Sequence, residues 1–198
     1  MKALISVYDK QGLEQFCDTL ESINCEIYST GGTLKYIKSK GYKVRSITEI
    51  TNHEEILEGR VKTLHPNIHA GILADTENPN HLSDMKRLNL DIFDIVINNL
   101  YPFEKVSTDP NSNFDQIIEN IDIGGPSMLR AAAKNFKRMI VLYDPDDYPL
   151  ISEKLKTGSV DLNIRKYLAI KVFKNTSEYD RKIFDYLIEL DFGAPGRI

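Results

Sequence analysis

The first fifty residues alternate between short apolar runs and segments in which apolar residues recur at helical spacing. The runs are "ALISV" (3–7), "CEIYS" (25–29) and "KVRSI" (43–47). Helical spacing extends from Leu13 to Ile23, with Asp9 as the expected N-cap. A second helical segment, "LKYIKSK", ends at Gly41, as is typical of a helix C-terminus. This alternation predicts βαβ units and a parallel sheet.

The rest of the chain extends the same pattern. "FDIVINNL" (93–100) and "RMIVLY" (138–143) have the composition of buried strands. From Asp161 onward apolar residues recur at helical period, which predicts one or two packed helices. No internal repeat, low-complexity tract or linker interrupts the 198 residues. We therefore expect one α/β domain over residues 1–198, with a helical C-terminal segment.

Composition excludes several classes of function. The formal net charge is −4, which argues against broad nucleic-acid binding because that depends on massed Lys and Arg. No apolar run approaches the roughly 18 residues of a membrane span, and no signal peptide is evident. The two cysteines, Cys17 and Cys25, form no disulfide framework. These features predict a cytoplasmic protein, and an anionic small molecule could still bind in a locally basic pocket.

Four polar stretches fall at the predicted strand ends, where open α/β sheets bind their ligands. They are "SVYDK" (6–10), "STGGT" (29–33), "GRVKTLHP" (59–66) and "INNLYPF" (97–103). In the second, glycines would let backbone N–H groups approach a phosphate, and the hydroxyls of Thr30 and Thr33 would add donors. The alternative is a glycine turn between strand and helix. The stretch matches neither G-x-G-x-x-G nor a Walker A loop.

The third and fourth stretches each have two interpretations. Arg60 could grip a phosphate with two hydrogen bonds and Lys62 could act as a point charge, or both could be solvated surface. Asn98 and Asn99 could contact a ligand or only cap the strand end, and Tyr101 could only pack. Spacing does not choose between these alternatives.

The sequence supports neither a metal site nor a Ser/His/Asp catalytic triad. His65 and His69 are four residues apart, but the intervening Pro66 argues against a helix that would align them. No HExxH pattern, Cys/His cluster or nucleophile elbow occurs. We expect no metal.

The stretch "IDIGGPSMLRAAAKN" (121–135) places an acid before a helix that Pro126 would begin. Asp122 could serve the chemistry together with Lys134, which lies further along that helix. Alternatively, Asp122 accepts hydrogen bonds from backbone donors and Lys134 is surface. Spacing leaves both interpretations open.

These five motifs, in this order, closely resemble the inosine monophosphate (IMP) cyclohydrolase domain over residues 3–192. That domain is normally the N-terminal half of a bifunctional purine-biosynthesis enzyme that also contains AICAR transformylase. The resemblance implies a methylglyoxal-synthase-like α/β fold and a homodimer. It also implies the last step of de novo purine synthesis, dehydrative ring closure of the ribonucleotide formyl-AICAR to IMP. That reaction needs neither metal nor cofactor.

The resemblance also implies functional residues. The chemistry would fall to Lys134, Asp122, Lys62 and Tyr101. The substrate-binding positions would be Tyr8, Asp9, Lys10, Thr30, Gly31, Gly32, Thr33, Arg60, Val61, Thr63, Asn98, Asn99, Ile123 and Gly124. Lys134 and Asp122 would exchange protons with the substrate, while Lys62 and Tyr101 would orient the formyl group and stabilise the oxyanion. An Asp–Lys pair titrates as a unit, so which group is the base stays open.

This chain departs from the family pattern in three places. Tyr8 stands where the family often has serine, and Thr30 replaces another common serine while keeping the hydroxyl. No transformylase half is present, so the chain is either a stand-alone cyclohydrolase or a shortened form of a protein that also uses a formyl-folate. Methylglyoxal synthase and a regulatory nucleotide-binding module are the rival interpretations.

Overall fold

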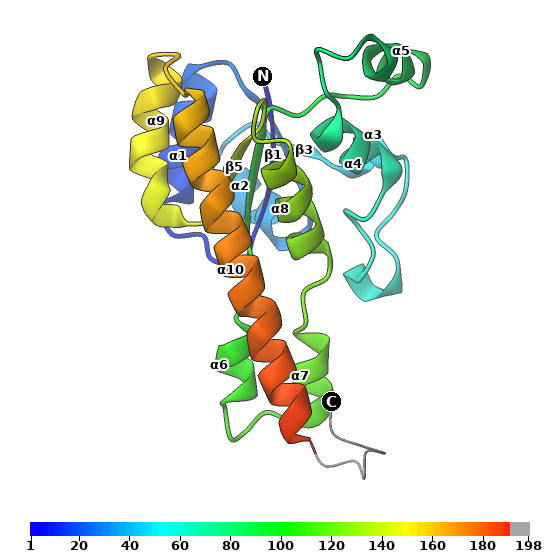
Figure 1. Cartoon of the computed structure of the whole chain (residues 1–198), viewed down its shortest axis with the longest axis vertical. Helices are drawn as coiled ribbons and strands as arrows, with labels where there is room; N and C mark the ends of the chain where they lie inside the picture. Colours follow the sequence, from blue (N-terminus) through cyan, green and yellow to red (C-terminus); the bar gives the residue numbers. More distant parts are fainter. Residues whose placement is uncertain (191–198) are drawn as a thin grey trace.

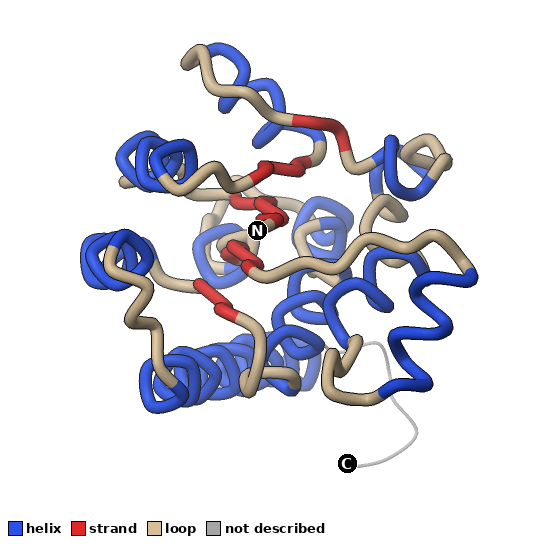
Figure 2. The backbone as a smooth tube through the Cα atoms, turned by 90° about the horizontal axis from the view of Figure 1, so that it is seen from above, coloured by secondary structure: helices blue, strands red, loops and turns tan. Residues whose placement is uncertain are grey.

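A five-stranded, all-parallel sheet forms the centre of the computed structural model, which describes residues 1–190 (Figure 1). The strands are β1 (Lys2–Val7), β2 (Glu26–Ser29), β3 (Arg45–Ser46), β4 (Ile95–Asn99) and β5 (Ile140–Leu142), in the order β3-β2-β1-β4-β5. Helices lie on both sides of the sheet when it is viewed from above (Figure 2). The predicted α/β class and parallel sheet are confirmed.

Burial explains why the central strands read as continuous apolar runs. Every residue of β4 is buried, and most of β1 is buried as well. Parallel strands covered on both faces lack the alternation of a half-exposed strand. The edge strand β3 is shorter than the predicted 43–47, because Ile47 already accepts the N–H of Ile50 in the next turn.

The helices alternate with the strands as expected, and several of them are short. They are α1 (Leu13–Ser22), α2 (Gly31–Ser39), α3 (Thr48–Thr51), α4 (Pro66–Leu73), α5 (Pro79–Arg87), α6 (Phe103–Ser107), α7 (Phe114–Glu119), α8 (Gly124–Lys134), α9 (Tyr148–Lys156) and α10 (Leu162–Glu189), with the 3-10 turns η1 (Leu57–Gly59) and η2 (Pro145–Asp147). Asp9 was expected to cap α1, and this is wrong. Gly12, in a left-handed conformation, precedes the helix, and Asp9 accepts the N–H of Gln11 in the turn before it.

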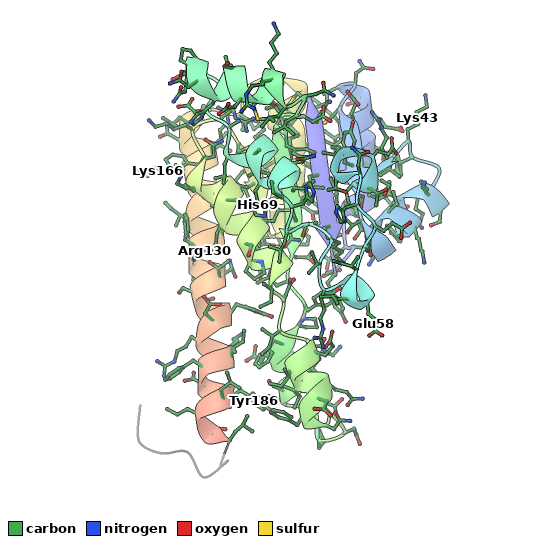
Figure 3. All side chains as sticks on the ribbon, turned by 90° about the vertical axis from the view of Figure 1, so that its right-hand side faces the viewer. Lys43, Glu58, His69, Arg130, Lys166 and Tyr186 are labelled. Carbon is green, nitrogen blue, oxygen red and sulfur yellow. The ribbon has the colours of Figure 1, made fainter. Side chains whose placement is uncertain are left out.

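The predicted C-terminal helical segment is one helix, α10, of 28 residues. It runs along the length of the molecule, packs on α8 and β5, and lies beside α6 towards its C-terminal end (Figure 1). Arg130 of α8 lies over the ring of Phe173 on α10, between the two helices (Figure 3). Lys171 bonds Asp144 and Asp147 at 2.7 Å each. This segment is therefore an integral part of the domain.

The residues after α8 hold α4 in place. Asn135 donates to the carbonyls of Ile72 and Ala74, and the partly buried Arg138 donates to the carbonyls of Gly71, Ile72, Ala74 and Phe93. These bonds satisfy carbonyls at the C-terminus of α4 that the helix itself leaves unpaired. The C-terminal end of α4 is thereby tied to the segment between α8 and β5. Among the described residues, no helix is long and apolar enough to cross a membrane.

We predict that Gly71→Ala destabilises the fold by about 1–3 kcal/mol, the usual cost of overpacking. A Cβ at this position would lie 2.4 Å from the carbonyl oxygen of Asp91 and 2.9 Å from the ring of Phe93. Gly32→Ala is the control, because nothing lies within 4 Å of a Cβ there. Urea unfolding of both variants measures the difference, and equal midpoints would contradict the close approach.

Candidate active site

A cavity of about 830 Å³ opens at the carboxyl ends of β1, β2 and β4. All five sequence motifs contribute to its lining. The predicted site residues in its wall are Tyr8, Lys10, Thr30, Gly31, Gly32, Thr33, Arg60, Lys62, Thr63, Asn98, Asn99, Tyr101, Asp122, Ile123 and Gly124. The volume lies within the range of about 300–1,000 Å³ that small-molecule sites occupy.

The turn from β2 into α2 directs a helix N-terminus at the cavity. Thr30 is the N-cap residue, and Gly31 and Gly32 form the first helical positions. N–H groups at a helix N-terminus attract anions, so this wall suits a phosphate. The expected donor role of the Thr33 hydroxyl is wrong. That hydroxyl donates to the carbonyl of Val7 at 2.9 Å, and it accepts the N–H of Val7 at 3.0 Å.

The two asparagines at the end of β4 differ in their surroundings. Asn99 accepts the N–H groups of Tyr8 and Asp9 at 2.7 and 2.9 Å and donates to the carbonyl of Asp9. Its amide thus fixes the loop after β1. Asn98 donates to the carbonyl of Ser6 at 2.6 Å, and its buried Oδ1 has no hydrogen-bond partner among the described residues. Asn98 therefore lines the cavity with its donor already used and its acceptor buried.

The segment before α4 forms another wall of the cavity. A single bridge between Ile56 and Val61 closes this loop, whose tip is η1. Arg60 pairs with Glu119 at the end of α7 through Nε at 3.1 Å and through Nη2. A Cβ built on Gly31 would lie 3.8 Å from Nζ of Lys62 and 3.9 Å from Oε1 of Glu55. Cations and carboxylates therefore both line this wall of the cavity.

Asp122 lies where the loop after α7 turns into α8. Its Oδ1 accepts the N–H of Gly125 at 2.8 Å. Burial raises the pKa of its carboxyl group above the ordinary value, while the N–H of Gly125, the charge of Lys62 and the N–H of Tyr101 each lower the pKa. The carboxylate therefore accepts a backbone donor, as the structural interpretation predicts, and the charge nearby that favours its ionised form is that of Lys62.

The glycine after this turn is required by the close approach of the carboxylate. A Cβ on Gly125 would lie 2.4 Å from Oδ2 of Asp122 and 2.9 Å from Cδ2 of Leu100. Any side chain there would displace Asp122. The second glycine of the motif therefore sets the position of the carboxylate.

The structure does not bring Lys134 to the cavity. Lys134 is the last residue of α8 and is exposed, whereas Asp122 precedes the first residue of the same helix. An α-helix rises about 1.5 Å per residue, so the eleven residues of α8 separate its ends by about 15 Å. Within one chain Lys134 therefore lies outside the cavity wall, and its exchange of protons with Asp122 stays a prediction. Asp9 and Val61 also lie outside the cavity wall, and Asp9 lines a shallower groove beside it.

Sequence reasoning missed several residues of this wall. They are Ser6, Val7, Glu55, Glu58, Gly59, Ile118, Glu119, Asn120, Ile121, Gly125 and Met128. Glu55 and Glu58 lie in the irregular stretch just ahead of Arg60, so their position beside a basic motif was the only available signal. No group of three or more His, Cys, Asp or Glu residues in the described part of the chain could hold a metal ion.

Comparisons with known proteins agree with this arrangement. Residues 12–127 match the MGS-like domain family, and residues 132–195 match the AICARFT/IMPCHase bienzyme family. The "Bifunctional purine biosynthesis protein PurH" of Staphylococcus saprophyticus is 51% identical over 185 residues, which are 93% of this chain and 38% of that protein. Its counterpart from Caldicellulosiruptor saccharolyticus is 52% identical over 186 residues, which are 93% of this chain and 36% of that protein.

A solved structure described as "Crystal structure of ForH" is similar over nearly its whole length. It has a TM-score of 0.84 and 34% sequence identity, and the match covers 94% of this chain and 96% of that one. The curated relatives are longer, since this chain spans little more than a third of their length. The chain belongs to the MGS-like domain family, in the group formed by the N-terminal part of the PurH proteins.

Proposed function

We propose that this chain is an IMP cyclohydrolase that closes formyl-AICAR to IMP in purine biosynthesis. The observation that carries the proposal is the meeting of Asp122 and Lys62 in one cavity beside the N-terminus of α2. An acid and a base next to an anion site suit a phosphorylated substrate that must lose and gain protons. The match of residues 132–195 to the AICARFT/IMPCHase family favours this reaction over methylglyoxal synthesis.

Binding begins with the phosphate. The N-terminus of α2 and the cations Lys10, Arg60 and Lys62 line the same cavity. Arg60 bonds Glu119 through Nε and Nη2, so this ion pair does not use Nη1 of the guanidinium. A phosphate held at this end would leave the heterocycle to reach towards Tyr101 and Asp122.

Ring closure then needs one proton removed and one supplied. Asp122, as a carboxylate, takes a proton from the carboxamide nitrogen as that nitrogen attacks the formyl carbon. The ammonium group of Lys62 donates a proton to the formyl oxygen, which becomes a hydroxyl. In the second half Asp122 returns its proton to the hydroxyl, which leaves as water, and the neutral amine of Lys62 takes the proton of the former formamide nitrogen, which completes the purine ring and restores both groups. Tyr101, at the rim beside Tyr8, would orient the formyl group.

The first test is the absorbance of purified protein mixed with formyl-AICAR in buffer that contains a chelator and no folate. We expect the hypoxanthine chromophore of IMP to appear at a rate proportional to enzyme. Folded protein that binds IMP in calorimetry but yields no product would contradict the proposal and favour the regulatory nucleotide-binding module.

Asp122→Asn should lower kcat by about 10²- to 10⁴-fold, the usual contribution of a positioned base. Because its pKa is raised, wild-type enzyme should lose activity on the acid side at a pH above the ordinary aspartate range of about 3.9. Rate profiles between pH 4 and 9, in about half-unit steps, measure both effects. Asp84→Asn, at an exposed ion pair on α5, is the control. Near-normal turnover in Asp122→Asn would rule out the assigned role.

Arg60→Ala should raise KM about tenfold and change kcat less than about threefold, because its contact is with the phosphate in the ground state as much as in the transition state. Arg87→Ala is the matched control, since Arg87 is an equally exposed arginine paired with Asp84 away from the cavity. Initial rates over a range of substrate concentrations separate the two constants. An unchanged KM would remove Arg60 from the binding site.

A further inference from the structure

The hydroxyl group of Tyr179, on α10, ties down the segment that carries Asp122. It accepts the backbone N–H of Asp122 at 2.8 Å and donates to the carbonyl of Asn120 at 3.3 Å. Tyr179 is only 8% exposed and does not line the cavity. One phenol from outside the cavity wall therefore bonds the backbone of two residues just before α8.

The ring of the same tyrosine packs against the segment that carries Tyr101. It packs edge-on against Phe103 with ring centroids 6.2 Å apart. Phe103 begins α6 two residues after Tyr101, whose backbone N–H lowers the pKa of the Asp122 carboxyl group. Tyr179 thus contacts the segment that carries Tyr101 through its ring and the segment that carries Asp122 through its hydroxyl.

The hydroxyl can keep this role over the whole working range of pH. Burial raises the pKa of Tyr179 to about 12, and the negative charge of Asp122 acts in the same direction. A neutral phenol both accepts and donates, which the pair of contacts to Asp122 and Asn120 requires.

We propose that Tyr179 is a positioning residue for the reaction, which sets where the Asp122 carboxylate lies relative to Lys62 and the substrate. The proposal rests on the function proposed above. It gives α10 a part in catalysis although α10 contributes no side chain to the cavity wall. A shift of about 1 Å in a reacting group can cost about 10²-fold in rate. Loss of the Tyr179 hydrogen bonds should therefore lower kcat measurably.

The test is Tyr179→Phe in the full chain, with Tyr186→Phe as the control. Tyr186 lies on the same helix (Figure 3). Its ring also packs on Phe103, with ring centroids 5.7 Å apart. Phenylalanine keeps the ring and removes only the hydroxyl. We expect kcat to fall about 10- to 100-fold with KM within about threefold, and the acid limb of the rate profile to move. Tyr186→Phe should match wild type in all three.

Failure of the positioning role of Tyr179 and failure of the proposed function give different results. If wild type turns over and Tyr179→Phe keeps kcat within about twofold, the positioning role is wrong. A parallel rise in KM with unchanged kcat would also overturn it, because that pattern belongs to weakened binding. If wild type does not turn over, the proposed function has failed, and backbone amide exchange then tests the tie alone.

Amide exchange also decides the case in which Tyr179→Phe does not fold. In wild type the amide of Asp122 should exchange far more slowly than in an unstructured peptide, because Tyr179 holds it. In a folded Tyr179→Phe it should exchange faster while the amides of β1 and β4 keep their protection. Exchange of the wild-type Asp122 amide at the peptide rate would overturn the proposal.

Discussion

The parallel pairing of β1 with β4 is the constraint on which the site depends. Ser6 pairs with Asn98 and Val7 with Asn99, so both strands end at the same level of the sheet. The loop after β1 is then fixed by the amide of Asn99, and the end of β4 is fixed by the bond from Asn98 to Ser6. Because the carboxyl ends of parallel strands share one edge, loops from distant parts of the sequence meet there.

Local charge explains how an acidic chain can suit an anionic ligand. The formal net charge is −4, yet Lys10, Arg60 and Lys62 gather at one edge of the sheet beside the N-terminus of α2. The chain's own carboxylates balance this cluster, as in the pair of Arg60 with Glu119. A long-range field set by net charge is screened over about 10 Å in salt, so the local arrangement governs binding.

Sequence reasoning succeeded where the signal is local. The central strands are buried on both faces, so they read as apolar runs, and motifs placed at strand ends were expected to converge. It failed where a contact joins distant residues. Arg60 and Glu119 are 59 positions apart, and Asp122 and Tyr179 are 57 apart. Nothing in the sequence around Thr33 indicates that its hydroxyl would be used by the backbone of Val7.

Asp122 and Lys134 lie at opposite ends of α8, where the helix dipole favours an acid and a lysine respectively. An acid just before the first turn of a helix and a lysine in its last turn are each stabilised by the helix dipole, with opposite signs at opposite ends. Asp122 and Lys134 occupy those two ends of α8. Their spacing is therefore one that a helix favours. The positive charge next to Asp122 comes from Lys62, which lies sixty residues earlier in the chain.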